Sequence, residues 1–231
     1  MVIDMATIKE NLDNVYRKIE EACAKSGRRT EDITLLAVTK TVPVERIREI
    51  MDLGVTSLGE NRVQELLSKY DDLPDAKWHI IGHLQTNKVK NIIGKTELIH
   101  SVDSIRLAEE IGRQSVNKGI KTDILLEVNV SGEESKYGMT LDFVDEMIDS
   151  CTRIEGINVK GLMTMAPLGA EENEIRRIFS SLYKKYVDIS TKKYDNISME
   201  YLSMGMSGDF HIAIEEGANI VRVGRGLFRL I

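Results

Sequence analysis

The sequence has 231 residues, a length that suits one α/β barrel, and its 42% hydrophobic and 29% charged residues are ordinary values for a globular protein. Its 31 basic and 37 acidic residues give a formal net charge of −6, which argues against a general nucleic-acid-binding protein. Two cysteines are too few for a disulfide framework, and no apolar run approaches the roughly 18 residues of a membrane-spanning helix. The first residues lead into a charged helical pattern rather than a signal peptide, so we expect a cytoplasmic protein.

The first predicted element is an amphipathic helix over residues 4–25. Its apolar residues recur at steps of three and four from Ile8 to Ala22, and Gly27 ends the pattern. An apolar run at residues 34–39 then predicts a short buried strand. Pro43 suits the first turn of a helix, and the apolar spacing after it predicts a second helix that ends at Gly54.

The rest of the chain repeats this alternation. Eight strands are predicted, at residues 34–39, 55–58, 78–84, 98–102, 123–130, 159–165, 200–204 and 220–223, with amphipathic stretches between most of them. Continuous apolar runs are typical of parallel strands that are covered on both faces. We therefore predict one domain over residues 1–231, a closed (β/α)8 barrel (TIM barrel) with an extra N-terminal helix. An open doubly wound sheet is the alternative.

The chemistry of such a barrel lies at the carboxyl ends of its strands. Lys40 directly follows the first predicted strand. A lysine at the mouth of an apolar barrel is partly desolvated, which favours its amine as a nucleophile toward carbonyl groups. The alternative is a solvated lysine that merely ends a strand.

The segments after the seventh and eighth predicted strands suit a phosphate. Ser207 lies in a loop of small residues that leaves backbone N–H groups free to hold an anion, and Gly224 and Arg225 add a second close approach and a positive charge. These two loops are the recurrent phosphate site of the (β/α)8 architecture. Because strand one neighbours strand eight, a phosphorylated aldehyde, pyridoxal 5′-phosphate (PLP), is the candidate ligand. Otherwise Ser207 is an ordinary helix cap.

Two further residue types, arginine and histidine, are candidates for a binding site. Arg222 lies within an apolar strand, where a buried guanidinium needs a partner, either a pyridine nitrogen or an acidic side chain. His79 and His83 are four residues apart, but on a strand that spacing separates them by about 13 Å, so no shared metal ion is predicted. We expect His83 to line the pocket and His79 and His100 to be structural.

These strand-end residues resemble the pyridoxal phosphate homeostasis protein family, also called the proline synthase co-transcribed family. The resemblance extends over essentially the full length and rests on segments in the family's order: LAVTK at 36–40, GENRVQE at 59–65, WHIIGHLQTNK at 78–88, SKYG at 135–138, GLM at 161–163, LSMGMS at 202–207 and VRVG at 221–224. It implies a fold-type III PLP barrel, similar to the N-terminal domain of alanine racemase.

The resemblance also implies roles for individual residues. Lys40 would be the Schiff-base lysine, and Arg222 the partner of the pyridine nitrogen. The phosphate ligands would be Ser207 and the backbone of Gly224 and Arg225. The remaining cofactor-binding residues that it implies are Ser203 or Met206 beside the phosphate, Asn61 and His83 near the ring, and Lys136 as a mobile second lysine.

The sequence departs from the family's pattern after Gly224. Arg225, Gly226 and Arg229 stand where the family has a hydroxyl residue, a small residue and a glycine. Without that hydroxyl, we expect either a backbone N–H group or the Arg225 guanidinium to hold the phosphate.

Three functions are compatible with these residues. The first, implied by the resemblance, is a monomeric PLP-binding protein of vitamin B6 homeostasis, which supports amino-acid balance, has PLP-dependent apo-enzymes as partners, and lacks efficient catalysis. The second is an amino-acid racemase, which needs an acid–base residue on each face of the substrate carbon. Alanine racemase takes the second residue from a separate β domain, which this sequence lacks. The third is a cofactor-free aldolase that uses Lys40 directly.

Overall fold

The computed structural model describes residues 5–133 and 136–228. The predicted helix start at residue 4, Ser135 of the SKYG segment and the departure at Arg229 lie outside the described residues.

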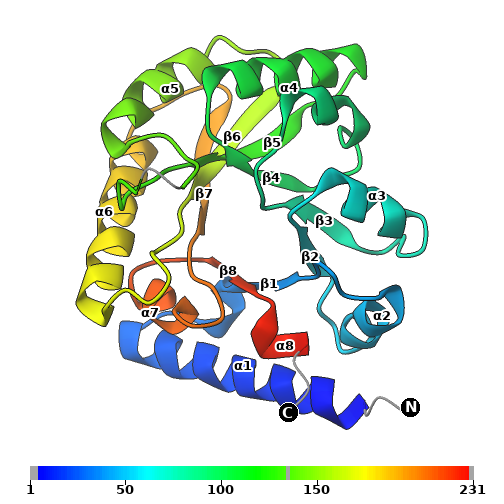
Figure 1. The fold of residues 1–231 in the computed structure, drawn as a ribbon. Helices are drawn as coiled ribbons and strands as arrows, with labels where there is room; N and C mark the ends of the chain where they lie inside the picture. Colours follow the sequence, from blue (N-terminus) through cyan, green and yellow to red (C-terminus); the bar gives the residue numbers. More distant parts are fainter. Residues whose placement is uncertain (1–4, 134–135, 229–231) are drawn as a thin grey trace.

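Eight parallel strands form a closed ring in chain order, as Figure 1 shows. β1 pairs with both β2 and β8, and this pairing closes the barrel. The predicted (β/α)8 barrel is therefore confirmed, and the open sheet is excluded. The strands are β1 (Thr34–Val38), β2 (Ser57–Glu60), β3 (Lys77–Ile80), β4 (Leu98–Val102), β5 (Thr122–Glu127), β6 (Ile157–Met163), β7 (Ile197–Ser203) and β8 (Ile220–Val223).

Helices surround the ring of strands (Figure 1). Between β3 and β4 the connection is a 3-10 helix, η2 (Thr86–Asn91), rather than an α-helix. The other 3-10 helices are η1 (Thr30–Asp32) and η3 (Leu141–Phe143). The α-helices are α1 (Met5–Ser26), α2 (Val44–Asp52), α3 (Val63–Tyr70), α4 (Ile105–Asn117), α5 (Val144–Cys151), α6 (Glu172–Ser190), α7 (Phe210–Glu215) and α8 (Arg225–Phe228).

Several predicted strand ends were wrong by two to four residues, most clearly at β3, which ends at Ile80 instead of residue 84. The last registered pair of β2 and β3 joins Glu60 to Ile80, so the ladder has no further partner. Beyond it, Gly82 passes so close to Asn61 that a Cβ on Gly82 would lie 2.6 Å from the Asn61 carbonyl oxygen. The apolar run thus continues past the strand and enters the loop at the barrel's mouth. Pro43 also differs from its predicted place, because it caps α2 from outside the helix.

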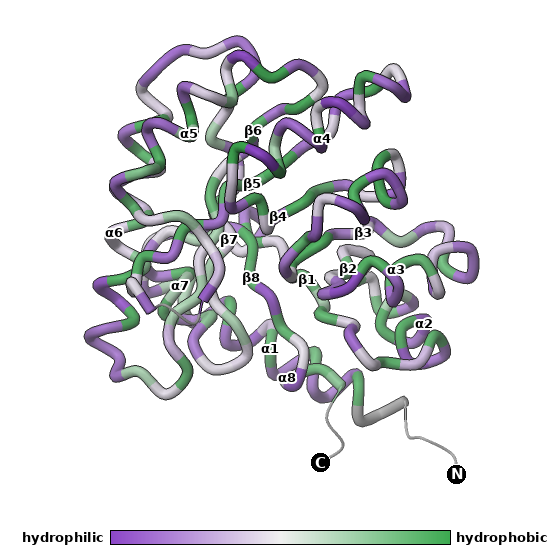
Figure 2. The backbone as a smooth tube through the Cα atoms, turned by 45° about the horizontal axis from the view of Figure 1, so that its top comes forward, coloured by the Kyte–Doolittle hydropathy of each residue, from purple (hydrophilic) through white to green (hydrophobic). Residues whose placement is uncertain are grey.

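The core has two parts, inside the ring and between the ring and the helices. A cluster from five different strands fills part of the interior: Leu36, Leu98, Leu125, Met163 and Ile220. The larger cluster joins the outer faces of the strands to the helices and includes Trp78, Phe179 and Ile47. In Figure 2 the hydrophobic tracts follow the strands, whereas the hydrophilic stretches follow the outer turns of the helices and the loops. Within the described residues, no helix is long and apolar enough to cross a membrane.

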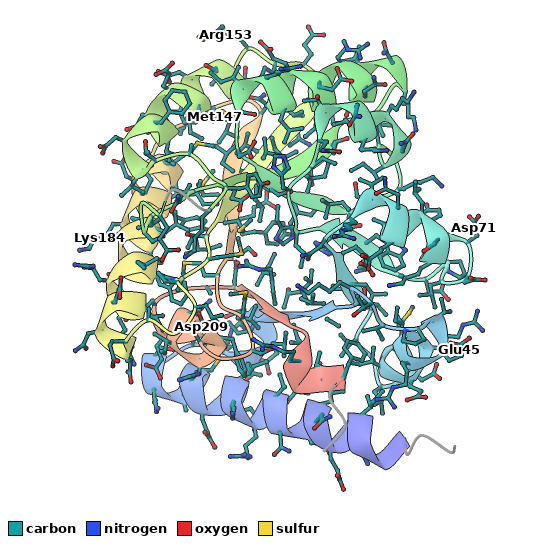
Figure 3. All side chains as sticks on the ribbon, in the orientation of Figure 1. Glu45, Asp71, Met147, Arg153, Lys184 and Asp209 are labelled. Atoms are coloured by element: carbon teal, nitrogen blue, oxygen red, sulfur yellow. The ribbon has the colours of Figure 1, made fainter. Side chains whose placement is uncertain are left out.

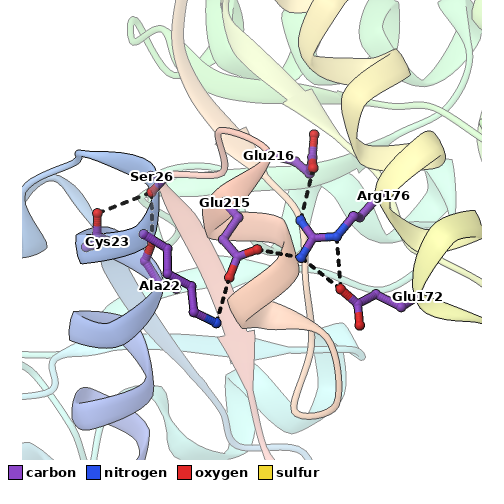
Figure 4. Close-up of polar contacts among 8 residues, drawn as sticks. Ala22, Cys23, Ser26, Glu172, Arg176, Glu215 and Glu216 are labelled. Carbon is purple, nitrogen blue, oxygen red and sulfur yellow. Dashed lines mark hydrogen bonds and ion pairs between the residues drawn. The ribbon is translucent and has the colours of Figure 1, made fainter.

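The extra N-terminal helix, α1, packs along α7 and α8 (Figure 1). The Asn11 amide of α1 donates to the carbonyl of Leu227 in α8 at 3.0 Å. Lys25 of α1 pairs with Glu215 of α7, which also pairs with Arg176 of α6 (Figure 4). The helix is therefore attached to the two helices that follow β7 and β8, the strands whose loops were predicted to bind a phosphate.

Candidate functional site

A cavity of about 540 Å³ opens at the carboxyl ends of the strands. Most of the predicted cofactor-binding residues line it together: Lys40, Asn61, His83, Met206, Ser207, Arg222, Gly224 and Arg225. Lys40, Gly224 and Arg225 also border a second cavity of about 560 Å³ beside α2. A larger groove of about 700 Å³ lies at the opposite end of the barrel, next to Gly119 and Gly156, and none of the predicted residues line it. We therefore take the first cavity as the candidate site.

Lys40 lies at the mouth of this cavity, in the turn after β1. Its side chain is exposed, and within the described residues its Nζ has no hydrogen bond or ion pair. The expected partial burial was wrong, because β1 ends at Val38 and the turn carries Lys40 beyond the apolar ring. The lysine is nonetheless free to bond a ligand that occupies the cavity.

The loops after β7 and β8 meet at one oxygen atom. The backbone N–H groups of Gly224 and Gly226 both donate to Ser207 Oγ, at 3.3 and 3.4 Å. Gly224 also passes close to β1, since a Cβ on it would lie 3.2 Å from Val38 Cβ. The segment after β8 therefore aims two N–H donors at one acceptor position, which the Ser207 hydroxyl of the loop after β7 occupies.

Ser207 is not the cap of the next helix. The N-terminal cap of α7 is Asp209, which lies at the start of that helix in Figure 3 and whose carboxylate accepts the N–H of Met206. This finding excludes the alternative in which Ser207 serves only as a helix cap. Its hydroxyl faces the cavity between the two loops.

Arg222 is buried on β8 and reaches the cavity from inside the barrel. Its guanidinium donates to Ser203 Oγ and to the carbonyl oxygen of Thr164. No carboxylate bonds it within the described residues, so the acidic-partner alternative was wrong. Burial lowers the pKa of Arg222 to about 10, while the charges of Asp209 and Glu127 act in the opposite direction. The guanidinium therefore stays protonated near neutral pH.

Ser203 lies next to the Arg222 guanidinium, at the end of β7, rather than in the loops after β7 and β8 that were predicted to hold a phosphate. It is fully buried and is not among the described residues that line the cavity. Its Oγ lies 3.0 Å from His100 Nδ1, and His100 Nε2 lies 3.0 Å from His79 Nδ1. Burial lowers the pKa of His79 to about 3 and that of His100 well below its usual range, so both rings are neutral. The two histidines are structural, as the sequence predicted.

The two residues predicted to lie near the cofactor ring come from the segments after β2 and β3. Asn61 lines the cavity, as does His83, whose Nδ1 lies 3.3 Å from the Asp103 carboxylate. The His83 ring stacks on Tyr137 with a centroid separation of 4.0 Å. Lys136 is not part of the described cavity lining and pairs with Glu133 at 2.9 Å.

Sequence reasoning missed Glu127, the last residue of β5. It is 3% exposed, it lines the cavity, and its Oε2 has no hydrogen-bond partner among the described residues. Desolvation raises the pKa of Glu127 to about 7; the Asp103 charge adds to this shift and the Arg222 charge opposes it. A glutamate inside the apolar run ILLEV was the available sequence signal.

The fold and the site together define a class of protein. It is a (β/α)8 barrel whose mouth presents an amine, a buried guanidinium and converging backbone N–H donors, which suits a small phosphorylated ligand. Within the described part of the chain, no group of three or more histidine, cysteine or acidic side chains is placed to hold a metal ion.

Comparisons with known proteins identify the family. The family model "Alanine racemase, N-terminal domain" matches residues 3–230. A pyridoxal phosphate homeostasis protein of Aquifex aeolicus is 44% identical over 221 residues, which cover 95% of this chain and 96% of that protein. The chain therefore belongs to the alanine racemase N-terminal domain family and, within it, to the pyridoxal phosphate homeostasis proteins, as the resemblance predicted.

Two solved structures agree with this assignment. An unknown protein from Bifidobacterium adolescentis is 37% identical, with a TM-score of 0.94 and 98% of both chains covered. PipY of Synechococcus elongatus, solved with PLP bound, is 32% identical, with a TM-score of 0.80, and the match covers 91% of this chain and 99% of PipY.

Proposed function

We propose that this protein binds PLP in the cavity at the carboxyl ends of the strands and acts in the homeostasis of that cofactor. The observation that carries the proposal is that Lys40, Ser207 and Gly224 line one cavity beside the paired strands β1 and β8. The N–H groups of Gly224 and Gly226 converge there on the Ser207 oxygen. The relatives named as homeostasis proteins and the PLP-bound PipY structure support it.

The loops after β7 and β8 suit the phosphate. The N–H groups of Gly224 and Gly226 already converge on a hydroxyl oxygen, and a phosphate oxygen is a stronger acceptor for the same donors. The Ser207 hydroxyl would then donate to the phosphate. Arg225 is exposed and has no ion pair among the described residues, so we propose that backbone groups replace the missing hydroxyl residue.

Arg222 is the proposed partner of the pyridine nitrogen of PLP. Two of its N–H groups are used by Ser203 and Thr164, and a guanidinium has five, so donors remain for the cavity. Because the guanidinium stays protonated near neutral pH, it would donate to the pyridine nitrogen and keep that atom free of a proton. This arrangement favours holding the cofactor over using its ring as an electron sink.

Lys40 is the proposed partner of the aldehyde group of PLP. Its Nζ is unpaired among the described residues and lines the cavity, so it can bond the aldehyde carbon covalently and reversibly. When bound, PLP supplies a reactive aldehyde and an electron-withdrawing ring. We propose that the protein holds this aldehyde in a protected form and releases it to apo-enzymes, as a cytoplasmic monomer.

A visible spectrum tests the binding proposal. Purified protein saturated with PLP should show an absorption band near the visible edge, and hydroxylamine should remove it. Lys40→Ala should abolish the band, whereas Lys185→Ala, a control on α6 at a position that does not line the cavity, should keep it. A band that survives in Lys40→Ala would overturn the assignment of the lysine.

A second measurement tests the role as a carrier against the racemase alternative. The loaded protein is incubated with L-alanine in deuterated water, and the D-enantiomer and the α-proton are followed. We expect no D-alanine at a turnover near 1 per second, a rate at the low end of typical enzymes. Its formation at such a rate would show that the protein is an enzyme.

A further inference from the structure

The turn that carries Lys40 is held by side chains from β2 and α3. Thr39, directly before Lys40, is fully buried. Its hydroxyl donates to Glu60 Oε1 at 2.7 Å, and its carbonyl oxygen accepts from Lys69 Nζ at 2.9 Å. Lys69 Nζ also lies 2.7 Å from Glu60 Oε1. One buried ion pair thus bonds both the hydroxyl and the carbonyl oxygen of the residue that precedes the lysine.

The residue directly after Lys40 is held as well. Thr41 has a φ of 62°, and it is the one non-glycine residue with a positive φ in the described part of the chain. This conformation is unfavourable for a β-branched residue and persists only where surrounding contacts impose it. The Thr41 N–H donates to Glu65 Oε2 of α3 at 3.0 Å. This bond and the one from the Val42 N–H to the Thr39 carbonyl oxygen, at 3.0 Å, are contacts that hold the turn in this conformation.

The contacts stop at the backbone, because the Lys40 side chain has no partner of its own among the described residues. The turn consequently sets the point and direction from which this flexible side chain extends to the cavity. A buried ion pair such as Glu60–Lys69 gains little stability over apolar side chains of similar size, because its desolvation cost offsets its Coulombic attraction. A stabilising role therefore does not explain why this pair is buried beside the lysine.

We propose that Glu60, Glu65 and Lys69 are positioning residues that set the Lys40 amine for covalent capture of PLP. In this step Nζ bonds the aldehyde carbon to form a C=N bond, and water leaves with the aldehyde oxygen and the two amine protons. The inference rests on the proposed function. Noncovalent binding of the phosphate and the ring uses other strands and should not depend on these residues.

Two ligands, PLP and pyridoxine 5′-phosphate, distinguish covalent capture by Lys40 from noncovalent binding in the cavity. Pyridoxine 5′-phosphate carries a hydroxymethyl group in place of the aldehyde, so it reports noncovalent binding alone. We expect Glu65→Ala to slow the growth of the PLP absorption band by about tenfold or more, because small misplacements of reacting groups cost this much. The dissociation constant of the Glu65→Ala variant for pyridoxine 5′-phosphate should stay within about twofold of the wild-type value.

Two control variants sharpen the test. Glu65→Gln keeps an acceptor oxygen for the Thr41 N–H and should restore most of the rate. Glu109→Ala, on the exposed face of α4, should leave both ligands unaffected. An unchanged rate of band growth in Glu65→Ala, or an equal loss of affinity for both ligands, would overturn the inference. A wild-type protein that forms no band at all would overturn the proposed function instead.

Discussion

At the scale of single residues, the cavity combines basic and acidic groups. Lys40 and Arg222 supply positive charge, and Glu127 is a buried carboxyl group with one oxygen that has no partner among the described residues. Arg222 is bonded by neutral groups, so its charge is available to a ligand. The uncompensated burial of Glu127 should be visible in the stability of the protein.

Glu127 should make the folded state less stable as the pH rises. Its folded pKa of about 7 lies above the ordinary value of 4.5, so the stabilising effect of protonation is fully present below pH 4.5 and lost as the pH rises through 7. Glu127→Gln removes this dependence. Urea unfolding at pH 4.5 and pH 8 should show the wild type losing up to about 3 kcal/mol relative to the variant. Parallel pH profiles for the two proteins would mean that the carboxyl group is not desolvated.

Arg225 should matter little to the affinity for PLP. The converging donors at the phosphate loops are backbone N–H groups, and the Arg225 side chain is exposed. Arg225→Thr should therefore change the dissociation constant for PLP by no more than about twofold. Fluorescence titration measures this constant. A tenfold or greater loss would instead assign the phosphate contact to the guanidinium.

At the scale of elements, the sequence predicted the order and type of the strands better than their ends. All of β4 and β8 could be predicted, because both are short runs of mainly apolar residues and are buried along their whole length. The end of β3 could not, because apolar residues, Ile81 and Leu84, continue after the ladder has stopped. The positive φ of Thr41 had no signal either, since tertiary contacts impose it.

The same distinction applies to the site. Residues at or near strand ends, such as Lys40 and Arg222, could be placed at the cavity from the strand order. Ser203 was misplaced because its side chain faces inward from the last position of β7. The sequence offers no rule for which neighbour a buried hydroxyl will bond, and here the neighbours are His100 and Arg222.

The helix α1 provides a test at this scale. Ile19 is 1% exposed and belongs to the core beneath α7 and α8. Ile19→Ala should lower the free energy of unfolding by about 3 kcal/mol, since it removes buried methyl groups and leaves a cavity. Urea unfolding measures the change, with the exposed Glu20→Ala as a control. A loss below about 1 kcal/mol would mean that α1 is only loosely attached to the barrel.

At the scale of the whole molecule, barrel closure explains why distant segments form one site. β1 and β8 lie at opposite ends of the chain, yet their pairing sets Lys40 beside Gly224. The neighbouring β7 is followed by Ser207, so the Lys40 amine and the loops after β7 and β8 lie on one rim of the closed barrel. The proposed binding of one small ligand would use all three segments.

Reduction of the PLP-saturated protein with borohydride, followed by peptide mass mapping, tests the central claim most directly, because reduction makes the covalent link permanent. We predict one pyridoxyl phosphate group per chain, carried by the peptide that contains Lys40. The same group on the peptide that contains Lys136, or none at all, would contradict the account.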